Sequence, residues 1–360
     1  MTELHAARRA RAQSEIAATG ADAALITSLP NIRYLSGLLS SNAAILLPAD
    51  GPGVLATDSR YFEAAQRDCQ DIEIVNARQV ERELAAIAST RGLGTVAFEA
   101  QEMTVERHIE LAEMPECPHL VPLGHLVEQL RMVKDQTEIE LLARACAITC
   151  EAFAALLKLI VPGRTERDLA IRLERSMIDL GADALAFDSI VASGPNGAIP
   201  HHSPGDRAFE VGDLITIDCG AQFGGYHADM TRTVCLGEPA EWQRDIYDLV
   251  AAAQLAGVAA ATPDADIADV DASARDMIGA AGHEDHFQHG LGHGVGLEVH
   301  EAPMMGPGRT GKLEDRVPVT VEPGIYLPGK GGVRIEDTLV VRAAGPAEIL
   351  TTTTKELLVL

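Results

Sequence analysis

The sequence predicts a mixed α/β (α+β) protein of two domains, a small α/β domain over residues 1–130 and a larger domain over residues 131–360. Three observations predict this organisation. A chain of 360 residues, 47% of them apolar, is long for one core and holds enough apolar side chains for two. Short apolar runs alternate with helical stretches in the first part. A long helical stretch, with a break expected near Lys134-Asp135, then leads into a part where acidic residues follow apolar runs.

The first domain is expected to alternate strands with helices. Its short apolar runs are bounded by glycine or polar residues, as strands are. Asp50-Gly51, between two of these runs, is a hairpin signal. Helices are expected between several strands, for example at 59–67 and 79–90. No glycine-rich nucleotide loop marks this domain as catalytic. The expected strands are residues 21–26, 43–47, 54–57, 72–75 and 96–98.

The second domain is expected to open with long helices and to continue with strands that carry polar motifs. Its first helical stretch ends at Pro162-Gly163, because proline and glycine stop helices. The next helix stops at Gly181 for the same reason. No tandem repeat of 20–50 residues occurs. The expected helices are residues 123–160 with the break already described, 165–180, 242–261 and 267–281.

Composition and charge exclude several classes of protein. The net charge of −24 argues against binding to nucleic acid or to an anionic membrane surface. No run of about 18 apolar residues occurs, so no transmembrane helix is expected. The basic start of the chain lacks the apolar segment of a secretory signal. None of the six cysteines forms a Cys-x-x-Cys pair, and free thiols fit a reducing compartment, so we expect a cytoplasmic protein.

Asp218 and Asp229 form the first of two acid pairs, each placed around a turn. Asp218 ends the apolar, β-branched run 214–217, and Asp229 precedes a second run typical of a strand. The midpoint between the two acids lies at Phe223/Gly224, beside Gly224-Gly225, which is a strong turn signal. In a hairpin about this midpoint, the two aspartates are expected to face each other.

Glu322 and Glu336 form the second pair. Glu322 follows the run 317–321, and the midpoint of the pair is Gly329, inside a glycine-rich turn. Opposed residues on antiparallel strands have Cβ atoms roughly 5 Å apart, where two like charges repel. Two divalent ions, about 3.5–4 Å apart in two-metal sites, turn that repulsion into coordination. A single acid at a strand end is usually a turn or cap residue, but two turn-symmetric pairs favour a dinuclear metal site over surface charge.

His293 is the candidate nitrogen ligand of this site. It lies in Gly290-Leu291-Gly292-His293-Gly294-Val295-Gly296, with glycine on both sides. A lone histidine is more often a hydrogen-bonded polar group than a ligand, so this assignment depends on the two acid pairs. Metal positions rich in oxygen ligands suit Mn²⁺, Co²⁺, Zn²⁺ or Fe²⁺ better than an ion that depends on thiolate.

Together these motifs resemble those of the pita-bread metallopeptidases, specifically the branch that contains aminopeptidase P and prolidase. The resemblance is strong over about 135–342 and weaker over the first 130 residues. It implies a small creatinase-like α/β domain followed by a catalytic pita-bread domain over 131–360. All five ligand positions carry the expected residue types in the expected order. The matching segments are 217–221, 227–233, 289–297, 299–303, 321–326 and 332–337.

The resemblance implies a role for each candidate ligand. Asp229 and Glu336 match the carboxylates that bridge two divalent ions, and Asp218 matches the chelator of one ion. His293 and Glu322 match ligands of the other ion, and the residue matching Glu322 also handles the proton of the attacking water. Two ions, with Mn²⁺ as the first choice, lower the pKa of a shared water so that hydroxide forms near neutral pH and attacks the carbonyl.

Three further histidines match family positions near the substrate. His201 matches a histidine that contacts the substrate near the scissile bond. His300 matches one that stabilises the tetrahedral intermediate or shuttles protons. His289 matches a pocket position, whereas His202 stands where relatives often carry another residue and is treated as a neighbour.

Arg334 and Tyr326 each leave two interpretations open. Arg334 shares a strand face with Glu336, so it is expected either to bind a substrate carboxylate bidentately or to form a salt bridge with a ligand acid. Tyr326 is expected either to line the substrate pocket or to belong to the core.

The function implied by the resemblance is hydrolysis of the bond between an amino-terminal residue and a following proline, as in aminopeptidase P. The strict Xaa-Pro dipeptidase (prolidase) is the first alternative. Methionine aminopeptidase shares the ligands but usually lacks such an amino-terminal domain, and a creatinase-like C–N hydrolase need not keep all five. Intact ligands argue against an inactive peptide-binding module. The expected partners are short peptides with proline second and, by family analogy, a second copy in a homodimer.

Overall fold

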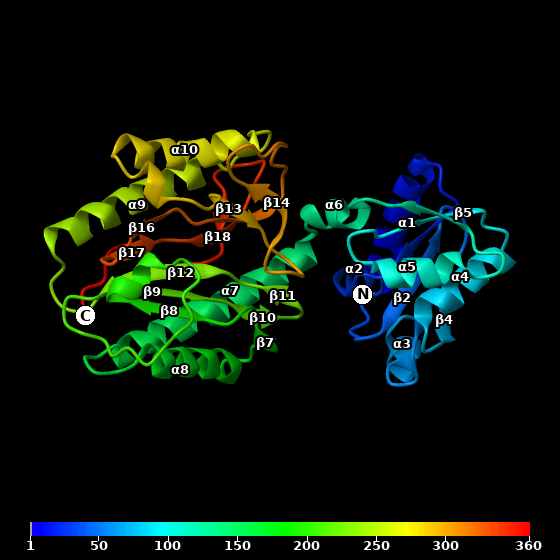
Figure 1. The fold of residues 1–360 in the computed structure, drawn as a ribbon, viewed down its shortest axis with the longest axis horizontal. Coiled ribbons are helices and arrows are strands. Elements are labelled where there is room, and N and C mark those ends of the chain that lie inside the picture. The colour runs from blue at the N-terminus through cyan, green and yellow to red at the C-terminus, as the bar shows by residue number, and fades with distance from the viewer. Residues whose placement is uncertain (1) are drawn as a thin grey trace. The chain divides into compact units, whose positions relative to one another are not determined.

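The computed structural model describes residues 2–360, which form two compact units that divide between Arg131 and Met132 (Figure 1). Both units combine helices and strands, so the expected mixed α/β fold class is confirmed. Helix α6 (Leu126–Met132) lies at the division. No helix in the described part of the chain combines the length and the apolar character needed to span a bilayer.

The amino-terminal unit is built on a six-stranded mixed sheet with the order β4-β3-β2-β1-β5-β6. The three strands β1, β2 and β3 are buried along their whole length, which explains why their sequences are continuous apolar runs. All five expected strands are present within two residues of their expected bounds, and β6 was not expected. The strands are β1 (Ala23–Ile26), β2 (Ala43–Pro48), β3 (Val54–Thr57), β4 (Glu73–Asn76), β5 (Thr95–Phe98) and β6 (His119–Pro122).

Helices pack on this sheet and complete its core. Val80 and Leu84 of α4 share a buried cluster with Ala23 and Leu25 of β1. α2 has proline in its first turn and ends at Gly37, whose φ of 81° is one that glycine adopts readily. The helices are α1 (Thr2–Thr19), α2 (Leu29–Ser36), α3 (Phe62–Asp68), α4 (Val80–Thr90) and α5 (Val105–Ala112).

The expected helix break near Lys134-Asp135 is confirmed, because α6 ends at Met132 and α7 (Gln136–Leu156) begins after Asp135. A capping box starts α7. Asp135 Oδ1 accepts from Glu138 N at 3.0 Å, and Glu138 Oε2 accepts from Asp135 N at 2.9 Å.

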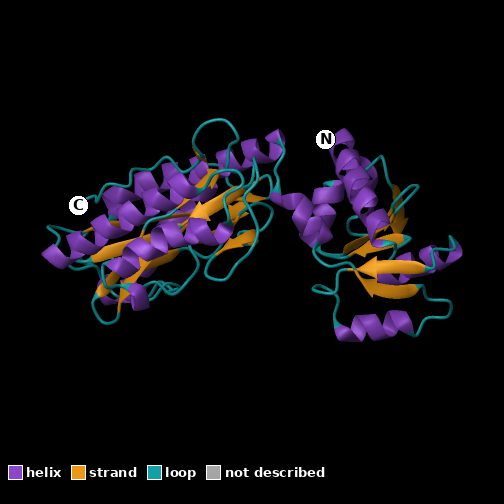
Figure 2. Cartoon of the chain, turned by 90° about the horizontal axis from the view of Figure 1, so that it is seen from above, coloured by secondary structure: helices purple, strands orange, loops and turns teal. Residues whose placement is uncertain are grey.

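The second unit places its strands between two pairs of helices. α7 and α8 pack on β8, β9 and β12 in one buried cluster, and α9 and α10 pack on β15, β16, β17 and β18 in another. Figure 1 shows one pair on each side of the strands, and Figure 2 shows helices running along the strands. The remaining helices are α8 (Glu166–Asp179), α9 (Glu241–Ala260) and α10 (Ile267–Ala280), with short 3-10 turns η1 (Leu157–Leu159), η2 (Gly194–Ala198) and η3 (Glu284–His286).

The strands of this unit form sheets with the orders β12-β9-β8, β14-β13-β15-β18-β19 and β11-β10-β7, and the hairpin β16-β17. The candidate ligands lie in β9 and β13 or directly beside β12, β15 and β18. The strands are β7 (Ala184–Leu185), β8 (Ile190–Ser193), β9 (Leu214–Cys219), β10 (Ala221–Phe223), β11 (Tyr226–His227), β12 (Met230–Cys235), β13 (Gly292–Gly294), β14 (Glu301–Met305), β15 (Pro318–Val321), β16 (Gly324–Leu327), β17 (Gly331–Arg334), β18 (Asp337–Val340) and β19 (Glu348–Ile349).

Candidate active site

Glu322 and Glu336 lie opposite each other in a long antiparallel arrangement. β15 pairs with β18, and β16 pairs with β17, in one common register that is centred on Gly329. Both glutamates lie in the short break between these strand pairs, where the same register sets them face to face. The expected symmetry of this acid pair is therefore confirmed.

Asp218 and Asp229 are not directly opposed, so the expected register of the first hairpin is wrong by two residues. Asp218 of β9 pairs with Thr231 of β12, and Asp229 immediately precedes β12. The turn falls on Gly224-Gly225, with φ angles of 59° and 87°. Two consecutive residues with positive φ are the pattern of a type I′ turn, which fixes the register of its strands. A shift of two residues keeps both aspartates on one face of the sheet, in diagonal positions.

His293 lies in β13 between two glycines that the neighbouring strands require. A Cβ atom on Gly292 would overlap the carbonyl oxygen of Thr320, and one on Gly294 would overlap that of Ala302. The glycines therefore allow the close backbone approach that holds β13 between β14 and β15.

The imidazole of His293 is oriented with one nitrogen towards the acids. Its Nδ1 lies 3.0 Å from Gly294 O and donates to it, which leaves Nε2 directed at the cluster. Nε2 is 3.3 Å from Glu322 Oε1 and 3.6 Å from Asp229 Oδ2. This orientation is the one a metal-binding histidine needs.

The ligand atoms form overlapping groups that correspond to two metal positions. Asp218, Asp229 and Glu336 place one oxygen each within 4.8 Å of one another, and one ligand atom each of His293, Glu322 and Glu336 does the same. Glu336 belongs to both groups, and Asp229 also groups with His293. The two shared acids are those that the resemblance gives as bridging.

Asp218 provides a separate test of whether a cation fits. Its Oδ1 is buried and has no hydrogen-bond partner among residues 2–360. An unpaired polar atom in the interior costs free energy that a partner would recover. A bound cation supplies such a partner, so the residues present fit divalent ions.

The carboxylates of the cluster have perturbed pKa values. Burial, followed by the charges of Glu336 and Asp218, raises the pKa of Asp229 well above its ordinary value. Burial, followed by the charges of Glu322 and Asp218, does the same to the pKa of Glu336. Burial also acts to raise the pKa of Glu322, but the hydrogen bond and charge of His293 bring it to about 2. With Asp218, whose pKa burial also raises, the cluster thus holds three acids that resist ionisation unless a cation is present.

Arg334 is 3% exposed and its guanidinium is surrounded by acceptors of the site. The sequence leaves two interpretations of Arg334 open. The structure contains the second of these, a salt bridge to a ligand acid, Asp218. Burial raises the pKa of Asp218, and the charge of Arg334 opposes this effect. The guanidinium donates to Asp218 Oδ2 at 2.8 Å, Tyr326 Oη at 2.9 Å, Thr231 Oγ1 at 3.1 Å and Pro200 O at 3.3 Å.

His289 and Tyr326 form a hydrogen-bonded pair beside Arg334. His289 Nδ1 donates to Gly290 O at 2.8 Å, so its Nε2 accepts from Tyr326 Oη at 2.8 Å. Burial lowers the pKa of His289 and raises that of Tyr326 to about 12, so both side chains are neutral near pH 7. Both expectations for Tyr326 are met, because its side chain is buried and also lines the cleft.

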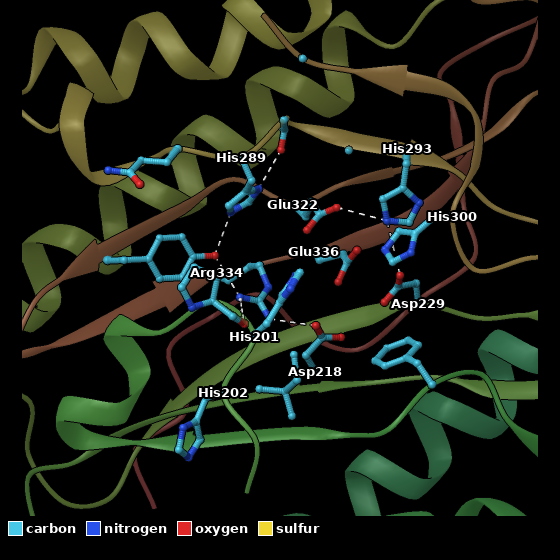
Figure 3. A pocket seen from close by; sticks show the side chains of 18 of the residues that line it. His201, His202, Asp218, Asp229, His289, His293, His300, Glu322, Arg334 and Glu336 are labelled. Atoms are coloured by element: carbon cyan, nitrogen blue, oxygen red, sulfur yellow. Dashed lines mark hydrogen bonds and ion pairs between the residues drawn. The ribbon is translucent and has the colours of Figure 1, made fainter.

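His201 and His300 lie at the cluster, whereas His202 points away from it (Figure 3). The centroids of the His300 and His293 rings are 4.3 Å apart, with the rings edge to face. Burial, followed by the charge of His293, lowers the pKa of His300. The structure therefore brings every residue singled out in the sequence to one place, with His202 on the outside.

All these residues line one open cleft of about 940 Å³. This volume is near the upper end of the range of about 300–1,000 Å³ for small-molecule sites. Besides the acid cluster, the lining of the cleft includes Phe187, Ile190, Val299, Met304 and Arg309.

Two family models match the chain. The model described as Metallopeptidase family M24 matches residues 140–343, and that of the Creatinase/Prolidase N-terminal domain matches residues 8–133. The first match covers more than half of the chain. The chain belongs to metallopeptidase family M24. The creatinase-like first domain and the pita-bread second domain implied by the resemblance are both confirmed.

Several relatives match this M24 chain over at least 94% of its length. A solved Xaa-Pro dipeptidase from Bacillus anthracis is 36% identical, with a TM-score of 0.95 over 99% of this chain and 100% of its own. A solved X-Pro aminopeptidase from Thermotoga maritima is 35% identical, with a TM-score of 0.90 over 98% of this chain and 99% of its own. The Xaa-Pro dipeptidase of Pyrococcus furiosus is 35% identical over 94% of this chain and 95% of its own.

The M24 chain is therefore an enzyme, a metallopeptidase of the Xaa-Pro peptidase and prolidase group. Family M24 uses divalent metals, and the acid and histidine groups of this chain are arranged to bind them.

Two threonines of the M24 site support the ligands and were not singled out in the sequence. Thr231 Oγ1 donates to Glu336 Oε2 at 2.8 Å, and Thr320 Oγ1 donates to Glu322 Oε1 at 3.3 Å. Thr231 stands two residues after Asp229, and Thr320 stands two residues before Glu322. Because side chains alternate along a strand, this spacing puts each threonine on the ligand face, and it is the signal in the sequence from which both could have been found.

Proposed function

We propose that this chain is a dinuclear-metal Xaa-Pro peptidase that releases an amino-terminal residue before proline and accepts peptides longer than two residues, as an aminopeptidase P does. The observation that carries the proposal is the set of four carboxylates and one imidazole, buried or partly buried and grouped as two metal positions that share Glu336. Relatives of similar identity are called Xaa-Pro dipeptidase and X-Pro aminopeptidase. The strict dipeptidase is therefore the second candidate.

Five residues would hold two divalent ions. Asp218, Asp229 and Glu336 would bind one ion, and His293 and Glu322 would bind the other together with the two bridging acids. Mn²⁺ is our first choice, and the donor set also suits Co²⁺, Zn²⁺ and Fe²⁺. When bound, such ions lower the pKa of a shared water and polarise a carbonyl oxygen.

Glu322 and the cleft histidines would move protons in the reaction. Glu322 is ionised near neutral pH because its pKa is about 2, so its carboxylate is able to take up the proton of the attacking water. Cleavage before proline releases a secondary amine, which must be protonated as it leaves. His201 and His300 line the cleft, and either one would donate that proton from a ring nitrogen.

Arg334, His289 and Tyr326 would support the metal ligands through a chain of hydrogen bonds. Arg334 orients Asp218 and Tyr326 through its hydrogen bonds. His289 in turn holds the hydroxyl of Tyr326. Direct binding of a substrate carboxylate by Arg334 remains a prediction.

Specificity for proline has a physical rationale. The bond before proline is a tertiary amide without an N–H, and the residue before proline prefers extended conformations. A peptidase that binds its substrate as an added strand loses a hydrogen bond at that position, so a site for proline must be built for it. The names of the relatives support this substrate class for the present chain.

The size of the cleft supports a substrate longer than a dipeptide. Its volume is about 940 Å³, and its lining includes Phe187 and Arg309 in addition to the acids. Residues beyond proline would lie against such lining residues.

Turnover of Ala-Pro, Ala-Pro-Ala and Ala-Ala-Ala by the Mn²⁺-loaded protein tests the proposal. Cleavage of Ala-Pro-Ala without cleavage of Ala-Ala-Ala supports it. Cleavage of Ala-Pro alone would make the enzyme a strict dipeptidase. No cleavage of any peptide with two ions bound would show that the substrate class is wrong. The homodimer and the cytoplasmic location remain predictions, and light scattering in solution tests the first.

A further inference from the structure

Glu166 is a buried carboxylate that lies outside the acid cluster and binds one continuous segment of the chain. It is the first residue of α8 and its side chain is 0% exposed. Burial acts to raise its pKa, but hydrogen bonds from the segment lower it overall, so the group is ionised near neutral pH. Oε1 accepts from Ser193 N at 2.8 Å, Ser193 Oγ at 2.7 Å and Asn196 Nδ2 at 2.9 Å, and Oε2 accepts from Gly205 N at 3.1 Å and lies 2.8 Å from His202 Nε2.

The segment held by Glu166 runs from Ser193 to Gly205 and forms one wall of the cleft. Its members Pro200 and His201 line the cleft next to the acids. One carboxylate therefore binds both ends of the segment and closes it as a loop. On its other side the segment packs closely on β17, where a Cβ atom on Gly197 would lie 3.1 Å from Gly332 N.

The two adjacent histidines of this segment have different surroundings. His201 points into the cluster near Asp218 and Arg334, and His202 points away from it (Figure 3). His202 reaches Glu166 instead. The position of His201 is thus coupled to Glu166 through the next residue in the chain and through the backbone at Gly205.

We propose that Glu166 is a positioning residue for His201, and that His202 transmits its effect. This inference rests on the proposed function, because it requires His201 to act on the substrate. Small displacements of a catalytic group are costly, since a misplacement of about 1 Å lowers turnover by about 100-fold. Without the carboxylate, the segment would lose the anchor that sets the distance between His201 and the scissile bond.

The carboxylate cannot be replaced by an amide at this position. Glutamine presents one acceptor oxygen and one NH₂ group, whereas both oxygens of Glu166 accept hydrogen bonds. An NH₂ group at Oε1 would face donors on Ser193 and Asn196, and one at Oε2 would face Gly205 N. E166Q should therefore release one end of the segment while it keeps the size of the side chain.

The experiment compares kcat and KM for Ala-Pro-Ala in E166Q, H201Q and the double variant, with bound metal measured in each. We expect E166Q to lower kcat by about 10–100-fold with metal content unchanged. The double variant should be no slower than H201Q, because a residue that acts only through His201 has nothing to position once His201 is gone. H202Q, which keeps an N–H donor for Glu166, should retain most activity, and H202L should resemble E166Q.

Glu138 supplies the matched control. It is also a buried acid in the first turn of its helix, and it binds Asp135 N and Tyr226 Oη. E138Q should lower thermal stability without the fall in kcat expected of E166Q. If kcat fell by the same factor in E138Q and E166Q, the effect of E166Q would be one of general stability, and the inference would be overturned.

The outcomes separate this inference from the proposed function. If H201Q turned over Ala-Pro-Ala normally, both the role of His201 and this inference would be wrong. If H201Q were slow and E166Q normal, only this inference would fail. If the fold-decreases in kcat of E166Q and H201Q multiplied in the double variant, this inference would also be overturned. If E166Q failed to fold, the comparison of H202Q with H202L would decide, and equal kcat values in those two would contradict the inference.

Discussion

Replacement of Arg334 by methionine tests whether this side chain balances the charge of the acid cluster. Arg334 is almost completely buried and donates to Asp218 Oδ2 at 2.8 Å. Removal of one partner of a buried ion pair costs roughly 3–5 kcal/mol, because the other charge stays buried without compensation. We therefore expect metal-free R334M to lose about 3 kcal/mol of its free energy of unfolding at pH 8.

This loss should be smaller at acid pH. Burial already raises the pKa of Asp218, and without the opposing charge of Arg334 it would rise further. A carboxyl group whose pKa is raised by folding contributes stability below its unfolded pKa and loses that contribution as the pH rises through its folded pKa. The stability difference between R334M and wild type should therefore grow from pH 5 to pH 8.

Urea unfolding in the presence of a chelator, followed by circular dichroism at both pH values, measures this difference. R334K is the control, because lysine keeps the positive charge but loses several of the hydrogen bonds that the guanidinium donates. Added Mn²⁺ should reduce the loss in R334M, since the ions replace the missing positive charge. An equal loss at pH 5 and pH 8 would refute charge balance and leave packing as the only role of Arg334.

Three further predictions follow from the same site. Glu336→Ala should abolish turnover of proline peptides while circular dichroism shows an intact fold; retained activity with normal metal content would disprove its bridging role. Mn²⁺ affinity should fall from pH 8 to pH 5, because protons compete for His293 and for Asp229, whose pKa values are raised; unchanged affinity in a calorimetric titration would contradict this. G292A should cost about 1–3 kcal/mol and weaken Mn²⁺ binding through the clash with the neighbouring strand, whereas the control G279A, which meets no atom closer than 3.9 Å, should gain up to about 1 kcal/mol.

The sequence predicted the ligand set because its signals are local. The strand-like run beside each acid and the glycine-rich turn between the acids of a pair are visible within a few tens of residues. For Glu322 and Glu336 the symmetric spacing was enough, and the structure has the same register. For Asp218 and Asp229 symmetry was misleading, since the type I′ turn rather than the acids sets the register. An error of two residues preserves the face, which is why the site was still recognised.

The supporting contacts could not be predicted, because they join distant parts of the chain. Glu166 meets Ser193 and Gly205 across separations of 27 and 39 residues, and only the folded chain brings them together. The choice between the two interpretations of Arg334 also depends on a contact 116 residues away in sequence. Composition and periodicity carry no information on such pairs.

Calorimetric titration of the metal-free protein with Mn²⁺ at pH 8 tests most directly whether these five residues form a dinuclear centre. We predict two ions per chain in the wild-type protein and loss of both in Glu336→Ala, because Glu336 belongs to both ligand groups. A single ion in the wild-type protein, or two ions still bound by Glu336→Ala, would contradict the account.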